Sequence, residues 1–156
     1  MRAWLLLDQS RAGAPCTADD PIQRFIDYVL DARVMLVRRA DDDIVAVTDG
    51  LTFGRWLAEG HELGWPDLDD LVYHLTTLFP PVRPKGWLEL RMFDALPSPF
   101  WKVAVAVTCA LLTTVDAADA VDRAIADTAD LWVDAAQLGL GHPDLARSAR
   151  DVFGLA

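Results

Sequence analysis

Residues His74–Asp94 read HLTTLFPPVRPKGWLELRMFD and carry the most informative pattern of the chain. Three closely spaced prolines, Pro80, Pro81 and Pro84, exclude a regular helix in the middle of this stretch, because proline lacks the amide hydrogen that a helix interior uses. The residues that follow alternate between charged and apolar types. We therefore expect an extended strand from Arg83 to about Phe93.

Side chains at alternate positions of a strand point to the same face. Leu88, Leu90 and Met92 would form an apolar face, which we expect to pack against helices. The opposite face would carry three cations, one carboxylate and an indole ring, from Arg83, Lys85, Trp87, Glu89 and Arg91.

Two interpretations of this charged face remain open. Charged residues on a strand usually form a solvated face, in which Glu89 would simply pair with Arg91 or Lys85. Three cations on one face repel each other unless an anion is bound, however, and the phosphates of ATP are such an anion. A carboxylate among them could hold Mg²⁺, which takes oxygen ligands and often shares them with phosphates.

The flanking segments predict an α+β fold. Short β-branched runs come early and helices late, without the regular alternation of a parallel sheet, which favours antiparallel pairing. The expected strands are Ala3–Leu7 and the pair Val34–Val37 and Ile44–Val47. Helical spacing and capping residues predict helices that start at Asp19 or Asp20 and that span Thr52–Glu59, Asp67–Leu78, Phe100–Thr114, Ala117–Gln137 and Pro143–Phe153.

The composition fits one packed domain over residues 1–156, since 53% of the residues are hydrophobic and 24% are charged. A net charge of −10 argues against nucleic acid or an anionic membrane as the main partner. Most of the tryptophans, such as Trp56 and Trp87, lie in periodic segments and are expected in the core. His74 is interpreted as a helix-packing residue, because a lone histidine is usually structural.

The cysteines and the apolar segments favour a cytoplasmic protein. Cys16 and Cys109 are far apart and form no metal-binding pair, which fits a reducing compartment. The longest apolar run, Val103–Val115, is shorter than the roughly 20 residues that a membrane span needs. We expect it to be a buried helix and the thiol of Cys109 to be buried and inert.

Residues His74–Asp94 resemble a motif of the glutamate–cysteine ligases of the plant and bacterial type. The flanking segments LTFGRWLAEG (51–60) and DLDDLVYHL (67–75) are most similar to the ligases of the ergothioneine pathway. The matching motif positions are His74–Thr77, Phe79–Pro80, Val82–Arg83, Leu88–Glu89, Arg91 and Asp94.

The resemblance implies an active-site strand of the glutamine synthetase-like superfamily. It implies that Glu89 is a Mg²⁺ ligand, and that Arg91 is catalytic and binds glutamate or the transferring phosphoryl group. Arg83 and Lys85 match basic positions near the nucleotide phosphates, although the family usually has arginine where Lys85 stands. The implied reaction uses ATP to phosphorylate the γ-carboxylate of L-glutamate, and the amine of L-cysteine then displaces phosphate.

One part of the family pattern is missing. Ligases of this family are longer and carry a Gly-x-Glu-x-Glu segment with further metal ligands near the N-terminus, whereas the glutamates here are Glu59, Glu62 and Glu89. We therefore expect a C-terminal portion of a larger catalytic domain, inactive without the missing N-terminal portion. The alternatives are another carboxylate–amine ligase of the same superfamily and a non-catalytic truncated remnant.

Overall fold

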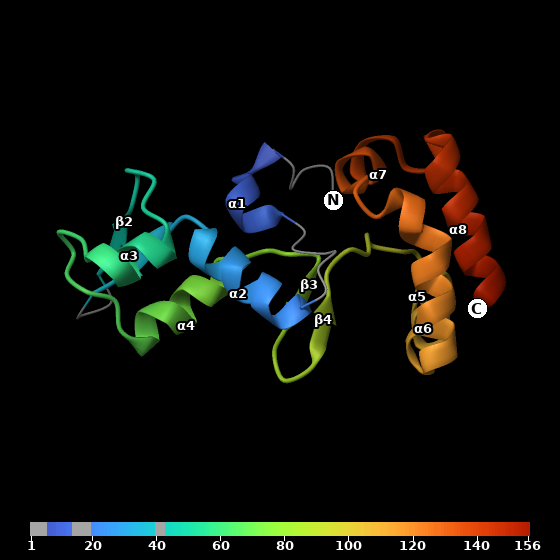
Figure 1. Ribbon diagram of the computed structural model, residues 1–156, viewed down its shortest axis with the longest axis horizontal. Helices are drawn as coiled ribbons and strands as arrows, with labels where there is room; N and C mark the ends of the chain where they lie inside the picture. Colours follow the sequence, from blue (N-terminus) through green and yellow to red (C-terminus); the bar gives the residue numbers. More distant parts are fainter. Residues whose placement is uncertain (1–5, 14–19, 40–42) are drawn as a thin grey trace. The chain divides into compact units, whose positions relative to one another are not determined.

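The computed structural model describes residues 6–13, 20–39 and 43–156 (Figure 1). The described residues fall into two compact units, one ending at Arg91 and the other beginning at Met92. Both units contain helices, and the first also contains antiparallel strand pairs, so the expected α+β class is confirmed. Cys16 and most of the strand expected at Ala3–Leu7 lie outside the described residues.

Within its described residues, the first unit contains four helices and two small sheets. Each sheet has two antiparallel strands, β1 with β2 and β3 with β4. The strands are β1 (Leu36–Arg38), β2 (Ile44–Ala46), β3 (Val82–Pro84) and β4 (Leu88–Leu90). The helices are α1 (Gln9–Ala12), α2 (Pro21–Asp31), α3 (Phe53–Glu59) and α4 (Leu68–Thr76).

Side-chain caps fix where these helices begin, as the sequence predicted. The carboxylate of Asp20 accepts hydrogen bonds from the first turn of α2, and the hydroxyl of Thr52 accepts one from the amide of Arg55 at the start of α3. Asp67 and Asp70 form a reciprocal capping box at the start of α4. Gly60 caps the end of α3. Its φ of 71° is a backbone conformation that residues other than glycine rarely adopt.

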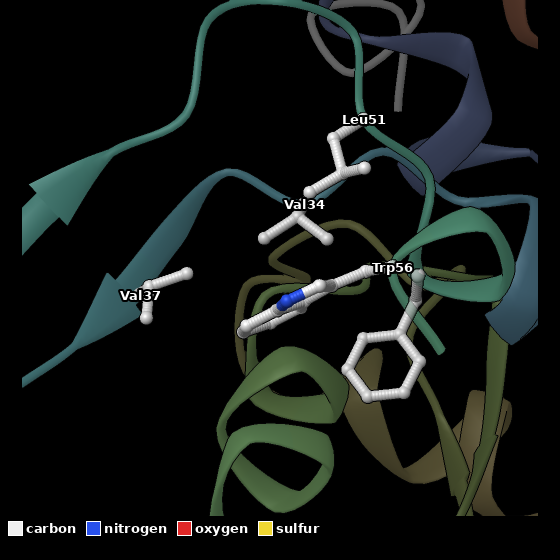
Figure 2. Packing of buried hydrophobic residues seen from close by; sticks show 5 residues of the cluster. Val34, Val37, Leu51 and Trp56 are labelled. Carbon is white, nitrogen blue, oxygen red and sulfur yellow. The ribbon is translucent and has the colours of Figure 1, made fainter. Parts of the chain in front are cut away.

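The larger core cluster of the first unit is formed by α3, by β1 and by residues next to them in the chain (Figure 2). The indole of Trp56 is 2% exposed, and its Nε1 donates a hydrogen bond to the carbonyl of Gly64 at 2.9 Å. The buried members of this cluster are Val34, Val37, Leu51, Phe53 and Trp56. A second cluster, Val29, Ala32 and Leu78, joins α2 to the segment after α4.

The expectation that the other tryptophans are core residues was wrong for several of them. Trp65, Trp87 and Trp101 are each at least half exposed. Trp87 lies in the chain reversal between the two short strands β3 and β4, and its ring is 68% exposed.

The second unit is helical. Its helices are α5 (Trp101–Leu112), α6 (Val115–Ile125), α7 (Trp132–Leu138) and α8 (Pro143–Leu155), with 3₁₀ turns at Ala126–Thr128 and Gly139–Gly141. The single helix expected over Ala117–Gln137 was wrong, because the chain breaks between α6 and α7. The hydroxyl of Thr128 lies 3.1 Å from the carbonyl of Ile125 and 3.3 Å from the hydroxyl of Ser148 in α8. Such side-chain contacts compete with helical hydrogen bonding.

The helix α5 differs from its prediction in burial. None of its residues is buried, and the side chain of Cys109 is exposed, so the expected buried helix and buried thiol were both wrong. Within the described residues, no single helix is long and apolar enough to cross a membrane. Helix α5 and the segment Val115–Thr128 meet that test of length and composition only together, and they are bent by 105°.

The burial of Trp56 leads to a stability prediction. Trp56→Ala should lower the free energy of unfolding by about 3–5 kcal/mol, because it removes a buried ring and leaves a cavity. Trp87→Ala is the matched control, since this ring is 68% exposed and its loss should change stability by less than about 1 kcal/mol. Urea denaturation followed by circular dichroism measures both. Equal losses in the two variants would contradict the assigned core.

Candidate functional site

The charged residues expected on one strand lie instead on a hairpin. The strands β3 and β4 are joined by Lys85, Gly86 and Trp87, and the amide of Lys85 donates to the carbonyl of Trp87 at 2.8 Å. Gly86 has a φ of 78°, a backbone conformation that favours glycine and reverses the chain. The prediction of one continuous strand from Arg83 to about Phe93 was therefore wrong.

The hairpin register still brings Arg83 and Glu89 together. They are directly opposite each other in the antiparallel pair, so their side chains share a face. Both Nε and Nη2 of Arg83 lie 2.7 Å from Oε2 of Glu89. This is a close two-nitrogen contact on one carboxylate oxygen, and the side chain of Arg83 is 13% exposed.

Two more cations approach the same carboxylate. Nη1 of Arg91 lies 3.3 Å from Oε1 of Glu89, and Nζ of Lys85 lies 3.9 Å from Oε2. We call Arg83, Lys85, Glu89 and Arg91 the hairpin charge cluster. Three cations and one carboxylate leave two positive charges in excess. The sequence-predicted site residues are thus brought together, although by a turn that was not foreseen.

Electrostatics keep Glu89 ionised. The hydrogen bond from Arg83 lowers the pKa of the Glu89 carboxyl, and the charges of Arg83, Lys85 and Arg91 act in the same direction, while desolvation opposes them. Because the carboxylate is ionised, it reduces the repulsion among the three cations and fixes the direction of the guanidinium groups.

Backbone contacts anchor the cluster to the unit. The amide of Arg91 donates to the carbonyl of Pro81 at 2.7 Å, and its guanidinium carbon lies 5.6 Å from the ring centroid of Phe79. Nη1 of Arg83 donates to the carbonyl of Leu78 at 3.4 Å. Leu78 is 1% exposed, so the cluster is attached directly to a core residue.

Comparison of the sequence with models of protein families shows the family of this chain. The model described as Glutamate-cysteine ligase family 2 (GCS2) matches residues 1–153. The chain belongs to this ligase family. The resemblance of the hairpin stretch to glutamate–cysteine ligases is thereby confirmed.

Curated relatives carry the same family name. The chain is 40% identical over 159 residues to the glutamate–cysteine ligase EgtA of Mycolicibacterium smegmatis, and 39% identical over 163 residues to that of Mycobacterium tuberculosis. Each match covers 99% of this chain and 37% of the relative. A chloroplastic glutamate–cysteine ligase A of Oryza sativa subsp. indica is 36% identical over 102 residues, which cover 60% of this chain and 20% of that protein. The chain thus spans little more than a third of the length of its mycobacterial relatives.

The described residues do not form a complete metal site for this ligase family. No group of three or more His, Cys, Asp or Glu side chains in the described ranges could hold a metal ion. Glu89 is the carboxylate of the hairpin charge cluster, and each of its oxygens faces a cation. A Mg²⁺ ion usually needs several oxygen ligands. Within the hairpin charge cluster, only Glu89 has a carboxylate that such an ion could use.

His74, the first residue of the ligase motif, is a packing residue, as expected. It is 3% exposed and stacks on the ring of Phe53 with centroids 4.8 Å apart. Its Nε2 lies 3.1 Å from the carbonyl of Val29, so this nitrogen carries the proton and donates it. Burial lowers the pKa of His74 and keeps it neutral. The motif histidine joins α4 to α2 and α3.

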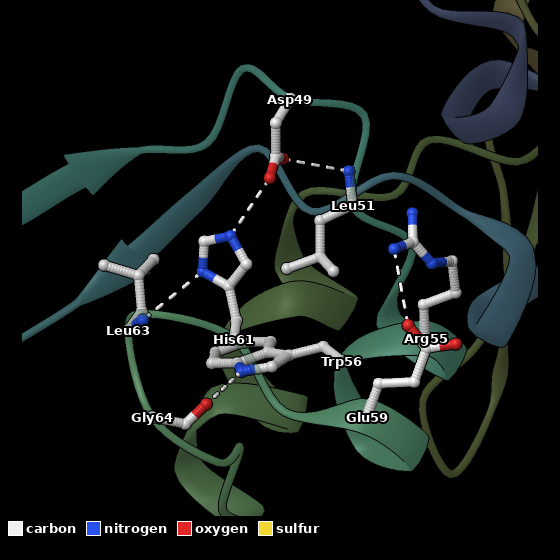
Figure 3. Close-up of polar contacts among 8 residues, drawn as sticks. All are labelled: Asp49, Leu51, Arg55, Trp56, Glu59, His61, Leu63 and Gly64. Atoms are coloured by element: carbon white, nitrogen blue, oxygen red, sulfur yellow. Dashed lines mark hydrogen bonds and ion pairs between the residues drawn. The ribbon is translucent and has the colours of Figure 1, made fainter.

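A second polar network, which the sequence did not reveal, closes a loop over the core (Figure 3). The amide of Leu63 donates to Nδ1 of His61 at 3.3 Å, which leaves Nε2 to donate to Asp49 at 3.0 Å. The same carboxylate group accepts from the amide of Leu51 at 3.1 Å. The hydrogen bond from His61 lowers the pKa of Asp49. Each ring nitrogen of His61 already has a partner, so the network is structural.

The buried, neutral state of His74 makes stability depend on pH. The folded-state pKa is below the unfolded value of about 6.5, so the stabilisation is present above that pH and is lost as pH falls through the folded pKa. His74→Gln keeps a hydrogen-bond donor for the carbonyl of Val29 but does not titrate. Between about pH 7.5 and pH 5.5, the free energy of unfolding should therefore fall less in this variant than in the wild type. Urea titrations at both pH values measure this. Identical pH dependence in wild type and variant would show that His74 does not titrate as described.

The Arg83–Glu89 contact leads to a spectroscopic prediction. Glu89→Gln should speed the exchange of the Arg83 Nε proton with water several-fold, because a neutral amide oxygen is a weaker acceptor than a carboxylate. NMR exchange spectra of the arginine Nε–H signals measure this. Glu59→Gln is the control, since Glu59 meets Arg55 in an exposed pair at 3.4 Å. Unchanged exchange at Arg83 in Glu89→Gln would contradict the hairpin geometry.

Proposed function

We propose that this chain forms part of a catalytic domain that uses ATP to join the γ-carboxylate of L-glutamate to the amine of L-cysteine. The hairpin charge cluster, with two positive charges in excess, is the observation that carries the proposal. Membership of the ligase family supports the reaction class. The mycobacterial relatives support a role in ergothioneine or related thiol biosynthesis.

The cluster suits the chemistry that this reaction requires. A carboxylate is a poor electrophile, so ATP first transfers its γ-phosphoryl group to the glutamate side chain and ADP leaves. The amine of cysteine then attacks the resulting acyl phosphate, and phosphate leaves. Negative charge is spread over the phosphoryl oxygens in the first step, and fixed cations stabilise it without needing to reorganise. The proposed reaction needs no nucleophile from the protein.

Each cation of the cluster has a proposed task. Arg91 contacts the glutamate substrate or the transferring phosphoryl group and is the catalytic residue, because its planar fork matches a carboxylate or a phosphate. Arg83 and Lys85 bind the nucleotide phosphates. Glu89 holds Arg83 at 2.7 Å and Arg91 at 3.3 Å, so both guanidinium groups are oriented before substrate arrives.

Glu89 has a second proposed task in the complete ligase. There it would contribute a carboxylate ligand to Mg²⁺, and the other ligands would come from residues outside this chain. The metal ion would add positive charge beside the phosphoryl oxygens. Because Arg83 already contacts Oε2 of Glu89, the arginine and the metal would share this carboxylate.

The proposal includes the setting of the site. The described sheets and helices are one part of a glutamine synthetase-like catalytic domain in the cytoplasm, and the rest of the ligase completes both the domain and the site. The match to 37% of the length of the mycobacterial ligases supports this incompleteness. Supplied alone, the 156-residue chain is expected to be inactive.

A chimera tests the proposed function. This chain should replace the matching segment of the Mycolicibacterium smegmatis ligase, and γ-glutamylcysteine formation should be measured by chromatography. We expect product that depends on ATP and L-cysteine from the chimera and none from the isolated chain. Arg91→Lys should lower kcat about 10²-fold or more, since it removes oriented donors from the transition state. Arg55→Lys, in an exposed ion pair, is the control.

The outcomes separate the alternatives. Product formation that does not depend on cysteine would indicate another carboxylate–amine ligase. A folded chimera without any ligase activity would favour a non-catalytic remnant. Full activity in Arg91→Lys would remove Arg91 from the catalytic role.

A further inference from the structure

A cavity of about 400 Å³ opens beside the hairpin charge cluster within the first unit. Its walls include the apolar side chains of Phe25 from α2, Val72 and Leu75 from α4, and the buried Leu78. Arg83 and Lys85 also line it, so two cations of the cluster border an apolar space. A cavity of this size and apolar character, with a few polar groups, is typical of a small-molecule site.

The charge of the lining selects among the proposed reactants. Of the described residues that line the cavity, two are cationic and none is acidic. L-Glutamate and L-cysteine each carry an α-ammonium group, which would lie against apolar walls without a carboxylate partner. ATP joins an uncharged, flat base to a polyanion, and the base suits the apolar walls while the phosphates suit the cations.

We infer that this cavity receives the adenosine portion of ATP, with its phosphates extending toward Arg83 and Lys85. This inference rests on the proposed function, because it takes ATP as the nucleotide of the reaction. Arg83 connects the two parts, since it lines the cavity and also contacts Glu89. Lys85 is 3.9 Å from Glu89 and its side chain is 47% exposed, so it is the more loosely held cation and is available to a phosphate.

A second cavity of the same unit also has apolar walls but differs from the first in the charge of its lining. It measures about 340 Å³ and lies between α3 and the start of α4, with lining residues that include Phe53, Leu57 and Leu68. Asp67 is the charged residue among its described lining residues. A carboxylate there would repel phosphates, so this cavity does not suit a nucleotide.

NMR titration of the 156-residue chain tests the inference. ATP, inorganic triphosphate and adenosine are added separately at low salt with EDTA, so that binding depends on the chain and not on a metal. We expect ATP to bind about tenfold more tightly than triphosphate, in line with the gain from burying a base. ATP should shift the methyl signals of Val72 and Leu75 and the amides of Lys85 and Gly86, whereas triphosphate should shift only these amides.

Two variants separate the cavity from the cations. Val72→Trp adds a large ring to the lining of the cavity without changing charge, and it should reduce ATP affinity to that of triphosphate. Val105→Trp is the matched control, because Val105 in α5 is 53% exposed, similar to the 55% of Val72, and lines neither cavity. Lys85→Met should weaken ATP and triphosphate alike.

Equal affinity for ATP and triphosphate, with no methyl shifts, would overturn the cavity as the adenosine site and leave the phosphate role of the cluster intact. An unchanged ATP affinity in Val72→Trp would also overturn it. Failure of both ATP and triphosphate to bind would contradict the cavity and, in addition, the phosphate role of Arg83 and Lys85 in the proposed function.

Discussion

The ion pair between Arg83 and Glu89 is the contact on which the organisation of the site depends. It forms because the register of β3 and β4 places the two residues opposite each other. The positive φ of Gly86 allows the turn that sets this register. Without the carboxylate at this position, Arg83, Lys85 and Arg91 would repel one another, and their side chains would lose the group that orients them.

Buried residues in and after α4 connect this ion pair to the core. His74 ties α4 to the carbonyl of Val29 in α2, and Leu78 is buried directly after α4. The carbonyl of Leu78 then accepts a hydrogen bond from Arg83. The ligase motif therefore has two physical parts. Its first residues fix the backbone that enters the hairpin, and its later residues carry the charges.

Local sequence patterns predicted much of the fold. The features that they did not predict involve contacts between residues that are separated in the sequence. The caps Asp20, Thr52 and Asp67 act within one helical turn, so the sequence located those helices. The sequence pattern did not predict the hairpin. Directly opposed residues of an antiparallel pair share a face, and so do alternate residues of one strand. A single strand and a hairpin centred on Gly86 therefore produce the same alternation of charged and apolar residues in the sequence. In the turn after α6, Thr128 contacts Ser148, which lies twenty residues later in the chain, and no local pattern contains this contact.

The charge balance of the chain supports the small anions proposed as ligands of the hairpin charge cluster. The whole chain has a net charge of −10, whereas the hairpin charge cluster has an excess of two positive charges. Interactions between exposed charges are screened beyond about 8 Å at physiological salt, so a small anion at the hairpin is governed by the nearby cations. A nucleic acid extends much farther and would also meet the acidic surface. A locally positive site on an acidic protein therefore favours compact anions, such as the phosphates and carboxylates of the proposed reaction, over extended polyanions.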